Sequence, residues 1–240
     1  MNRKQLLLYY QPIHELESRK IVAAEALLRS RRGSGEIRSG EPIAAGAEEG
    51  PDLFRFDSWM MQQAYCDAAQ WNGVRLHVNL SPREFEEGGS ITRRVRKLGR
   101  DLSFVSLEIT ETRYIDKPKQ TVRVLDHLRD LGVQLWLDDF GTIHSSISHL
   151  LSFRLDGLKI PSTFVKGLPS DKRCRSITKA IIDLAHDLGL KVIAEGIEHE
   201  KQLAFLRQAR CDYIQGFLWS QPMALDRFES WLRSFDSSGQ

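Results

Sequence analysis

The fold is decided by the stretch LLLYYQPIHELESRKIVAAEALL, residues 6–28. It contains two apolar runs, residues 6–13 and 20–28, and each is typical of a buried strand. Only the polar segment HELESR, residues 14–19, separates them. Two parallel strands need a connection of about a dozen residues or more, so the first strand is predicted to run antiparallel to the second.

The rest of the chain alternates apolar runs with segments of helical period. Further strands are expected within 75–82, 104–111, 133–141, 156–161, 190–198 and 213–220, and amphipathic helices within 53–71, 91–99, 121–132, 144–152, 174–189, 201–209 and 225–235. Eight apolar strands separated by helices favour an α/β fold, a (β/α)8 TIM-like barrel with its first strand antiparallel to the second. An open doubly wound sheet is the alternative.

Glycine marks several expected boundaries. Three helical segments are predicted to end in the left-handed conformation, at Gly99, Gly132 and Gly189. The stretch RSRRGSGEIRSG, residues 29–40, is rich in glycine and arginine but lacks the strand-to-helix context of a phosphate-binding loop. It is predicted to be a mobile, solvated loop.

Length and composition indicate one globular domain over residues 1–240, with 41% hydrophobic residues to build its core. The 34 basic and 32 acidic residues nearly cancel, so no broad field is expected to attract a nucleic acid polymer or an anionic membrane. The early LLLYY run is too short for a membrane segment. Three widely spaced cysteines suit reduced thiols in the cytoplasm better than disulfides or a zinc site.

A polar residue stands at the end of each predicted strand from the second onwards. These residues are Glu25, Asn79, Glu108, the pair Asp138 and Asp139, Lys159, Glu195 and Gln215. In a barrel these strand ends meet at one mouth, where the loops above them carry catalysis. One such residue alone would more often be structural, but a set in register predicts a functional site.

The charges at this mouth call for cations. Five of the side chains are carboxylates, and Lys159 is their one basic partner in the set. Carboxylates within a few ångströms of one another raise each other's pKa unless cations are present. Hard oxygen ligands without histidine or cysteine favour Mg²⁺ or Mn²⁺ over zinc, and adjacent aspartates allow two ions to share a ligand. A two-metal phosphodiester site is the resulting hypothesis.

The motifs EALLR, NLSP, EITE, DDFGT, LKI, AEGIE and QGF occur in this order between Tyr10 and Pro222. In this combination the chain resembles the EAL-domain phosphodiesterases, which hydrolyse cyclic di-GMP to linear pGpG. The resemblance implies a barrel with an antiparallel first strand, two bound Mg²⁺ or Mn²⁺ ions and a homodimer. A regulatory protein partner is a further expectation.

The resemblance also implies roles for individual residues. The implied metal ligands are Glu25, Asn79, Glu108, Asp138 and Asp139, with Asp138 shared between the two ions. The implied catalytic residues are Glu195 as base or second-metal partner, Lys159 as the cation that holds water or phosphate, Glu111 as anchor of the loop after strand five, and Glu198 as a further carboxylate. The implied contacts to the dinucleotide are Gln11, Leu27, Arg29 and Gln215.

The chain departs from the family pattern near the second metal. The family usually has DDFGTGYSSL and LKID, whereas this chain has DDFGTIHSSI and LKIP, so Ile143, His144 and Pro161 replace glycine, tyrosine and aspartate. Two hypotheses follow: an active phosphodiesterase, or a weakly active or inactive cyclic di-GMP receptor or protein-interaction module.

Two secondary expectations complete the sequence-based picture. His77 shares the inward face of its strand with Asn79 and is expected to line the core or the mouth rather than to bind metal. The apolar residues Ile143, Ile147 and Leu150 are interpreted either as a buried helix face or as part of a dimer surface.

Overall fold

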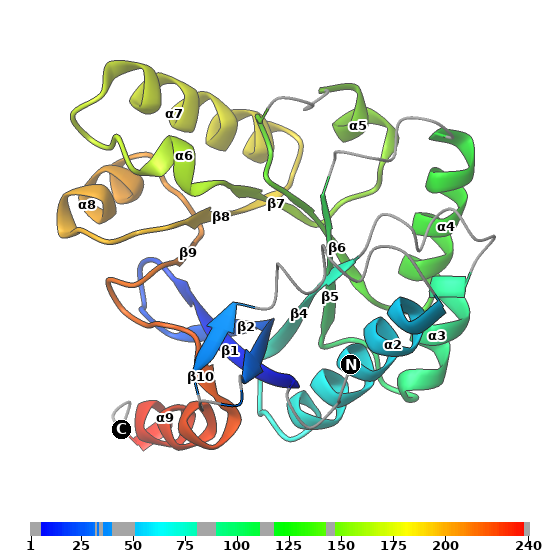
Figure 1. Ribbon diagram of the computed structural model, residues 1–240. Coiled ribbons are helices and arrows are strands. Elements are labelled where there is room, and N and C mark those ends of the chain that lie inside the picture. Colours follow the sequence, from blue (N-terminus) through cyan, green and yellow to red (C-terminus); the bar gives the residue numbers. More distant parts are fainter. Residues whose placement is uncertain are drawn as a thin grey trace.

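The computed structural model describes residues 6–31, 33, 36–39, 51–80, 90–110, 118–142 and 147–237. Eight strands pair into a closed barrel, confirming the predicted fold class (Figure 1). In chain order they are β1 Leu6–Glu15, β2 Ile21–Arg31, β4 Arg75–Leu80, β5 Val105–Thr110, β6 Gln134–Asp138, β7 Gly157–Ile160, β8 Lys191–Glu195 and β9 Tyr213–Gln215. The runs predicted to be strands all contribute one.

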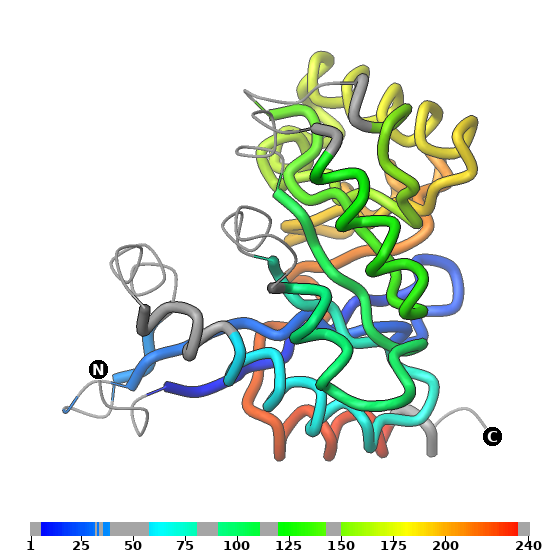
Figure 2. Tube along the Cα trace, turned by 90° about the vertical axis from the view of Figure 1, so that its right-hand side faces the viewer, coloured from blue at the N-terminus to red at the C-terminus, as the bar shows by residue number. Residues whose placement is uncertain are grey.

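The strand β1 is antiparallel to both of its barrel neighbours. Its register with β2 pairs Gln11 with Glu25, and its register with β9 pairs His14 with Ile214. The neighbouring pairs from β2 through β4 to β9 are parallel. The short connection anticipated from the sequence therefore produces one reversed strand. Figure 2 shows the N-terminal end of β1 and the C-terminal end of β2 extending together beyond the rest of the barrel.

Helices cover the outside of the barrel (Figure 1). They are α2 Pro51–Ala68, α3 Ser90–Leu98, α4 Pro118–Asp130, α5 Ile147–Ser152, α6 Ser162–Val165, α7 Lys172–Asp187, α8 Glu200–Gln208 and α9 Leu225–Ser237. The short α6 was not predicted, because a helix of four residues shows no apolar period. None of the helices in the described ranges is both long and apolar enough to cross a membrane.

Two short strands lie outside the eight and correct the sequence-based picture. The strand β3, Ile37–Ser39, pairs antiparallel with the outer end of β2, so the prediction of a loop throughout residues 29–40 is wrong. The reason is that β2 continues to Arg31 and offers a free edge for backbone hydrogen bonds. The strand β10, Met223–Ala224, pairs with β1 in the same way.

The glycines at two helix ends adopt the predicted conformation, with φ of +92° at Gly132 and +73° at Gly189. Gly99 does not have a positive φ, so that prediction is wrong. A Cβ at Gly99 would overlap the phenol ring of Tyr65. This position is glycine because α2 approaches it closely, not because the backbone turns left-handed.

The barrel is filled by side chains in layers, as closed eight-stranded barrels require. Below the mouth lies an apolar layer made of Ile13, Ala23, Trp136 and Ile193. A Cβ at Gly157 would overlap the indole of Trp136, so the absence of a side chain on β7 makes room for this ring. The larger hydrophobic cluster lies between the strands and the helices. The polar residues of the mouth therefore lie directly above a packed apolar layer.

Candidate active site

Lys159 occupies the centre of the barrel mouth, at the carboxyl end of β7. Its Nζ lies 2.6 Å from Glu195 Oε1, 3.0 Å from Glu108 Oε2, 3.2 Å from Glu25 Oε2 and 3.8 Å from Asp138 Oδ1. The Lys159 side chain is 1% exposed, so these contacts are hidden from water. Four predicted strand-end carboxylates thus converge on one ammonium group.

Glu25 lies within β2, six residues before the strand ends at Arg31, and its buried carboxylate accepts hydrogen bonds on both oxygens. Asn79 donates to Oε1 at 2.6 Å, and Gln215 donates to Oε2 at 2.7 Å. Burial alone would raise the pKa of Glu25, but the charge of Lys159 and these amide donors lower the pKa overall. A carboxylate in this apolar run therefore stays ionised inside the mouth.

The negative charges of the other carboxylates in the cluster are not fully compensated by Lys159. Burial, followed by the negative charge of Glu25, holds the pKa of Glu108 well above its ordinary value. The pKa of Asp138 is raised for the same two reasons. Burial raises the pKa of Glu195 to about 7, against the opposing charge of Lys159. Burial alone would lower the pKa of Lys159, but the surrounding carboxylates hold that pKa well above its ordinary value.

The donor set fits divalent metal ions. Asp138, Asp139 and Glu195 offer carboxylate oxygens that lie within 4.8 Å of one another. The buried Oε1 of Gln215 has no hydrogen-bond partner in the described part of the chain, while its Nε2 donates to Glu25. One lysine cannot neutralise four carboxylates, and oxygen-only donors suit hard cations. The residues present therefore match Mg²⁺ or Mn²⁺.

The local backbone turns Asp139 away from the strand. Asp139 has φ of +54°, an uncommon conformation for a residue other than glycine, and its N–H donates to Asp138 Oδ1 at 2.9 Å. Strained conformations of this kind persist where the surroundings impose them, often at functional sites. The turn keeps both adjacent carboxylates at the mouth, although strand alternation alone would separate them.

Three of the predicted dinucleotide contacts, Gln11, Leu27 and Arg29, lie on β1 and β2, and the fourth, Gln215, lies on the neighbouring β9. Gln11 is buried and accepts a hydrogen bond from Gln215 at 3.2 Å. Arg29 is half-buried, donates to the carbonyl of Leu28 and has its guanidinium 6.0 Å from the ring centroid of Tyr9. Leu27 is also half-buried on β2. These residues border the mouth on the β1 and β2 side.

One predicted site residue, Glu198, is not among the described residues that contact Lys159. Glu198 is exposed, and its backbone N–H donates to Gln202 Oε1 at the start of α8. Glu111 lies outside the described residues, as do Ile143 and His144. Pro161 is buried and caps the N-terminus of α6 without a side-chain hydrogen bond.

The sequence did not reveal that His77 contacts the cluster directly. Its Nδ1 lies 2.8 Å from Glu108 Oε1, and both side chains are buried. Strand alternation had placed His77 on the inward face, which was the available signal.

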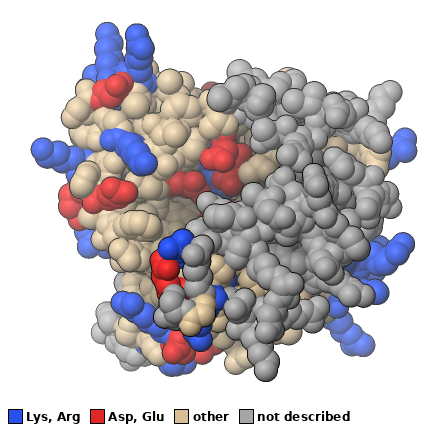
Figure 3. Space-filling view, viewed as in Figure 1, with Lys and Arg blue, Asp and Glu red and all other residues tan. Residues whose placement is uncertain are grey.

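The surface reflects this arrangement. On the face shown in Figure 3, acidic side chains gather near the centre of the molecule.

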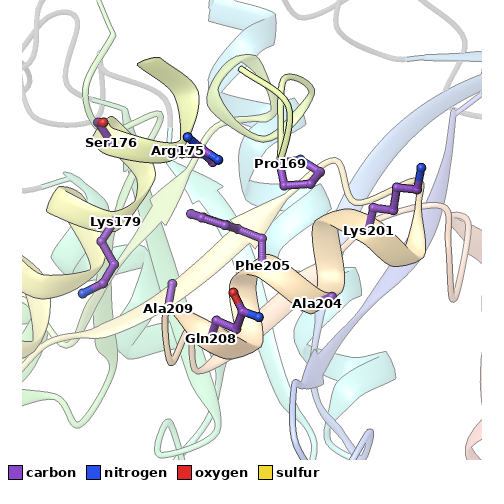
Figure 4. Close-up of a pocket in the computed structure, with 9 residues that line it drawn as sticks. All are labelled: Pro169, Arg175, Ser176, Lys179, Lys201, Ala204, Phe205, Gln208 and Ala209. Carbon is purple, nitrogen blue, oxygen red and sulfur yellow. The ribbon is translucent and has the colours of Figure 1, made fainter. Parts of the chain in front are cut away.

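A separate hollow of about 640 Å³ lies outside the barrel between α7 and α8, and Arg175, Lys179, Lys201 and Phe205 line it (Figure 4). Lys179 is already paired with Asp183 at 2.5 Å, and the hollow contains no strand-end residue. It takes no part in the chemistry assigned to the mouth.

Comparison with known proteins defines the class. The model of the EAL domain family matches residues 1–222, so the chain belongs to this family. It is 34% identical over 239 residues to the cyclic di-GMP phosphodiesterase NbdA of Pseudomonas aeruginosa, covering 96% of this chain and 30% of NbdA. It is 32% identical over 235 residues to the signaling protein YkoW of Bacillus subtilis, covering 95% of this chain and 29% of YkoW. The chain thus spans less than a third of these relatives.

Solved structures give the same result. The PaMucR phosphodiesterase in complex with c-di-GMP superposes with a TM-score of 0.86 at 29% identity, over 94% of this chain and 95% of that chain. BlrP1 of Klebsiella pneumoniae, in a manganese and cyclic di-GMP complex, superposes with a TM-score of 0.81 at 27% identity, over 94% of this chain and 57% of that chain. The barrel described above is therefore the fold of EAL domains.

Proposed function

We propose that this protein hydrolyses cyclic di-GMP to linear pGpG with two bound divalent ions, Mg²⁺ or Mn²⁺. The observation that carries the proposal is the convergence of Glu25, Glu108, Asp138 and Glu195 on Lys159 in the barrel mouth. The names of relatives such as NbdA support the substrate. We also propose that residues 1–240 form a single EAL-type domain, which works as a homodimer in the cytoplasm and receives its signal from a protein partner.

The proposed metal ligands are Glu25, Asn79, Glu108, Asp138 and Asp139. Bound divalent ions would supply the charge that ionises a water molecule and neutralises the phosphodiester. Glu25 and Asn79 are already joined at 2.6 Å, so part of the ligand set is organised without the ions. The raised pKa of Lys159 keeps this side chain protonated near neutral pH. In this proposal Lys159 therefore acts as a cation that attracts water or phosphate, and it does not act as a base.

Glu195 is the proposed base or second-metal partner. Its side chain is 23% exposed, the most open of the four carboxylates around Lys159, so it is accessible from the mouth. Arg29, Gln11, Leu27 and Gln215 are proposed to contact the dinucleotide. An arginine suits this role because its planar, permanently charged guanidinium pairs with two phosphate oxygens. Glu111 and Glu198 remain proposed active-site residues; Glu198 is not among the described contacts of Lys159, and Glu111 lies outside the described residues.

The test combines turnover with metal binding. Incubation with cyclic di-GMP and Mn²⁺, followed by chromatographic separation of the nucleotides, is expected to yield linear pGpG. Glu25→Ala should abolish this product and weaken Mn²⁺ binding in calorimetry, because it removes a buried ligand held by two amides. Glu200→Gln, at an exposed position on α8, is the matched control and should change neither. Unchanged Mn²⁺ affinity in Glu25→Ala would remove Glu25 from the ligand set.

A second candidate function rests on Pro161. The family usually has a carboxylate at this position, whereas here a buried proline begins α6. Loss of a carboxylate beside Lys159 favours a receptor that binds cyclic di-GMP with little hydrolysis. Binding without product, at saturating Mn²⁺, would select this alternative over the enzyme.

A further inference from the structure

The buried histidine beneath the mouth has a defined place in the barrel. His77 lies on β4, and the parallel register aligns it with Ser106 on β5, while Asn79 aligns with Glu108. His77 therefore sits one layer below Glu108 and reaches up to it. Its Nδ1 is 2.8 Å from Glu108 Oε1, and the two side chains are 2% and 0% exposed.

This contact divides the two oxygens of Glu108 between two partners. Oε1 meets His77, and Oε2 meets Lys159 at 3.0 Å. Lys159 lies at the centre of the mouth, in contact with Glu25, Asp138 and Glu195. The hydrogen bond from below therefore fixes the rotation of the carboxylate, so that Oε2 faces the centre of the mouth.

The imidazole ring is itself held in place. It packs against Trp136, with the ring centroids 5.2 Å apart and the planes at 56°. Trp136 belongs to the apolar layer with Ile13, Ala23 and Ile193, and Gly157 leaves the space that its indole fills. A donor fixed by close packing orients its acceptor more strictly than one that is free to rotate.

We propose that His77 is a positioning residue, which orients Glu108 for metal binding by donating its Nδ1 hydrogen to Oε1. The inference rests on the proposed function, because it takes Glu108 to be a metal ligand. A carboxylate that binds metal is ionised and only accepts hydrogen bonds, so the imidazole must carry its hydrogen on Nδ1. Hydrogen bonds of this kind, one step removed from the metal, commonly change metal affinity by about 10- to 100-fold.

The test measures Mn²⁺ affinity by calorimetry, with Mn²⁺ alone as the probe. His77→Leu keeps a side chain of similar bulk but removes the donor, and it should weaken Mn²⁺ binding by about 10-fold or more. His77→Asn places an amide N–H near the position of Nδ1 and should stay within about 3-fold of the parent. His77→Gln carries the same amide one methylene further out and should resemble His77→Leu. Circular dichroism confirms that each variant is folded.

A double-mutant cycle separates positioning from general stability. If His77 acts through Glu108, then His77→Leu should have little further effect on Mn²⁺ affinity in a Glu108→Ala background. Equal weakening in both backgrounds would overturn the proposal. If the leucine variant fails to fold, the asparagine and glutamine variants decide, and equal affinities of these two would also overturn it.

The outcomes distinguish this inference from the proposed function. Mn²⁺ binding by the parent that depends on Glu108 but is unchanged in His77→Leu refutes only the role of His77. Absence of Mn²⁺ binding by the folded parent, or binding unaffected by Glu108→Ala, refutes the assigned metal site and the positioning role together.

Discussion

At the scale of single residues, the mouth is dominated by an imbalance of charge. Lys159 contacts four carboxylates, and it satisfies Glu25 while Glu108, Asp138 and Glu195 keep raised pKa values. Without metal, these three groups bind protons more tightly in the folded protein than in the unfolded chain. The raised pKa values therefore lower the free energy of unfolding of the metal-free protein at neutral pH, and this is the cost of a site that binds cations.

Glu195 allows this cost to be measured. Its pKa rises from about 4.5 to about 7 on folding, so folding becomes less favourable as pH rises through this window, and the loss is complete above pH 7. In EDTA, Glu195→Gln should be more stable than the parent at pH 8, by on the order of 2 kcal/mol. At pH 4 the parent Glu195 is protonated and neutral like glutamine, so the two proteins should differ little. Urea unfolding at both pH values gives the comparison.

The control for this prediction is Glu200→Gln, which removes an exposed carboxylate outside the cluster. It should show no comparable difference between pH 4 and pH 8. A Glu195→Gln variant that differs from the parent by the same amount at both pH values would contradict the assigned pKa. Adding Mn²⁺ should reverse the advantage of the variant, because the ion stabilises the ionised carboxylate.

The residues at positions 143 and 161 are expected to determine whether the protein hydrolyses cyclic di-GMP or only binds it. The double variant Ile143→Gly with Pro161→Asp restores the family residues and should raise single-turnover hydrolysis of cyclic di-GMP, on the order of tenfold, with dinucleotide binding nearly unchanged. An aspartate also suits the N-terminus of α6, where Pro161 offers no side-chain hydrogen bond.

Rapid-quench measurements at saturating Mn²⁺, on the parent and the double variant, test this prediction. Efficient cleavage by the parent, with no gain in the variant, would mean that Ile143 and Pro161 do not impair catalysis, and the receptor hypothesis would be rejected. Binding by both proteins with cleavage by neither defeats the enzyme hypothesis.

At the scale of elements, Gly157 on β7 leaves space for the indole of Trp136 in the apolar layer below the site. Gly157→Ala should destabilise the protein by about 1–3 kcal/mol, because the new Cβ overlaps the indole of Trp136 in a packed layer. Gly33→Ala is the matched control, since no atom of the described residues lies within 4 Å of a Cβ there. Denaturant unfolding of the two variants provides the test, and equal stabilities would show that Trp136 adjusts without cost.

Most of the secondary-structure elements could be predicted from the sequence. The eight barrel strands and seven of the helices follow from apolar periodicity. The hairpin connection alone was enough to indicate the reversed β1. The short β3, β10 and α6 were missed because two to four residues carry no period. Their formation depends on edges and helix ends that other parts of the chain provide.

Prediction of the site was limited for a similar reason. Alternation along a strand indicates which face a side chain takes, and this was sufficient to gather Glu25, Glu108 and Lys159 at one mouth. It does not give the stagger between neighbouring strands, so the layer occupied by His77 and its contact with Glu108 required the structure. A family motif places Glu198 near the site, and the structure shows that this residue is exposed, so its role stays a prediction.

At the scale of the whole molecule, the apolar surface of α5 bears on the proposed homodimer. Leu150 is 7% exposed and belongs to the hydrophobic core, which agrees with the buried-face alternative and not with a place on the dimer surface. The side chains of Ile143 and Ile147 lie outside the described residues. Leu151 is 79% exposed, the largest value among the exposed large hydrophobic side chains of the described residues. Single exposed leucines are common on protein surfaces, and Leu151 is the described apolar side chain of α5 that a partner on this face would cover.

We therefore expect a dimer that depends on Leu151. Multi-angle light scattering at high micromolar concentration should give twice the chain mass for the parent. Leu151→Glu should shift it to the monomer, because a charge cannot be buried in an apolar contact without a partner. Leu188→Glu changes another exposed leucine, 41% exposed at the end of α7, and should leave the mass unchanged. A parent that is monomeric with and without cyclic di-GMP would contradict the dimer. A dimer insensitive to Leu151→Glu would instead place the interface elsewhere, since a symmetric contact presents the same residue from both subunits and doubles the effect of each substitution.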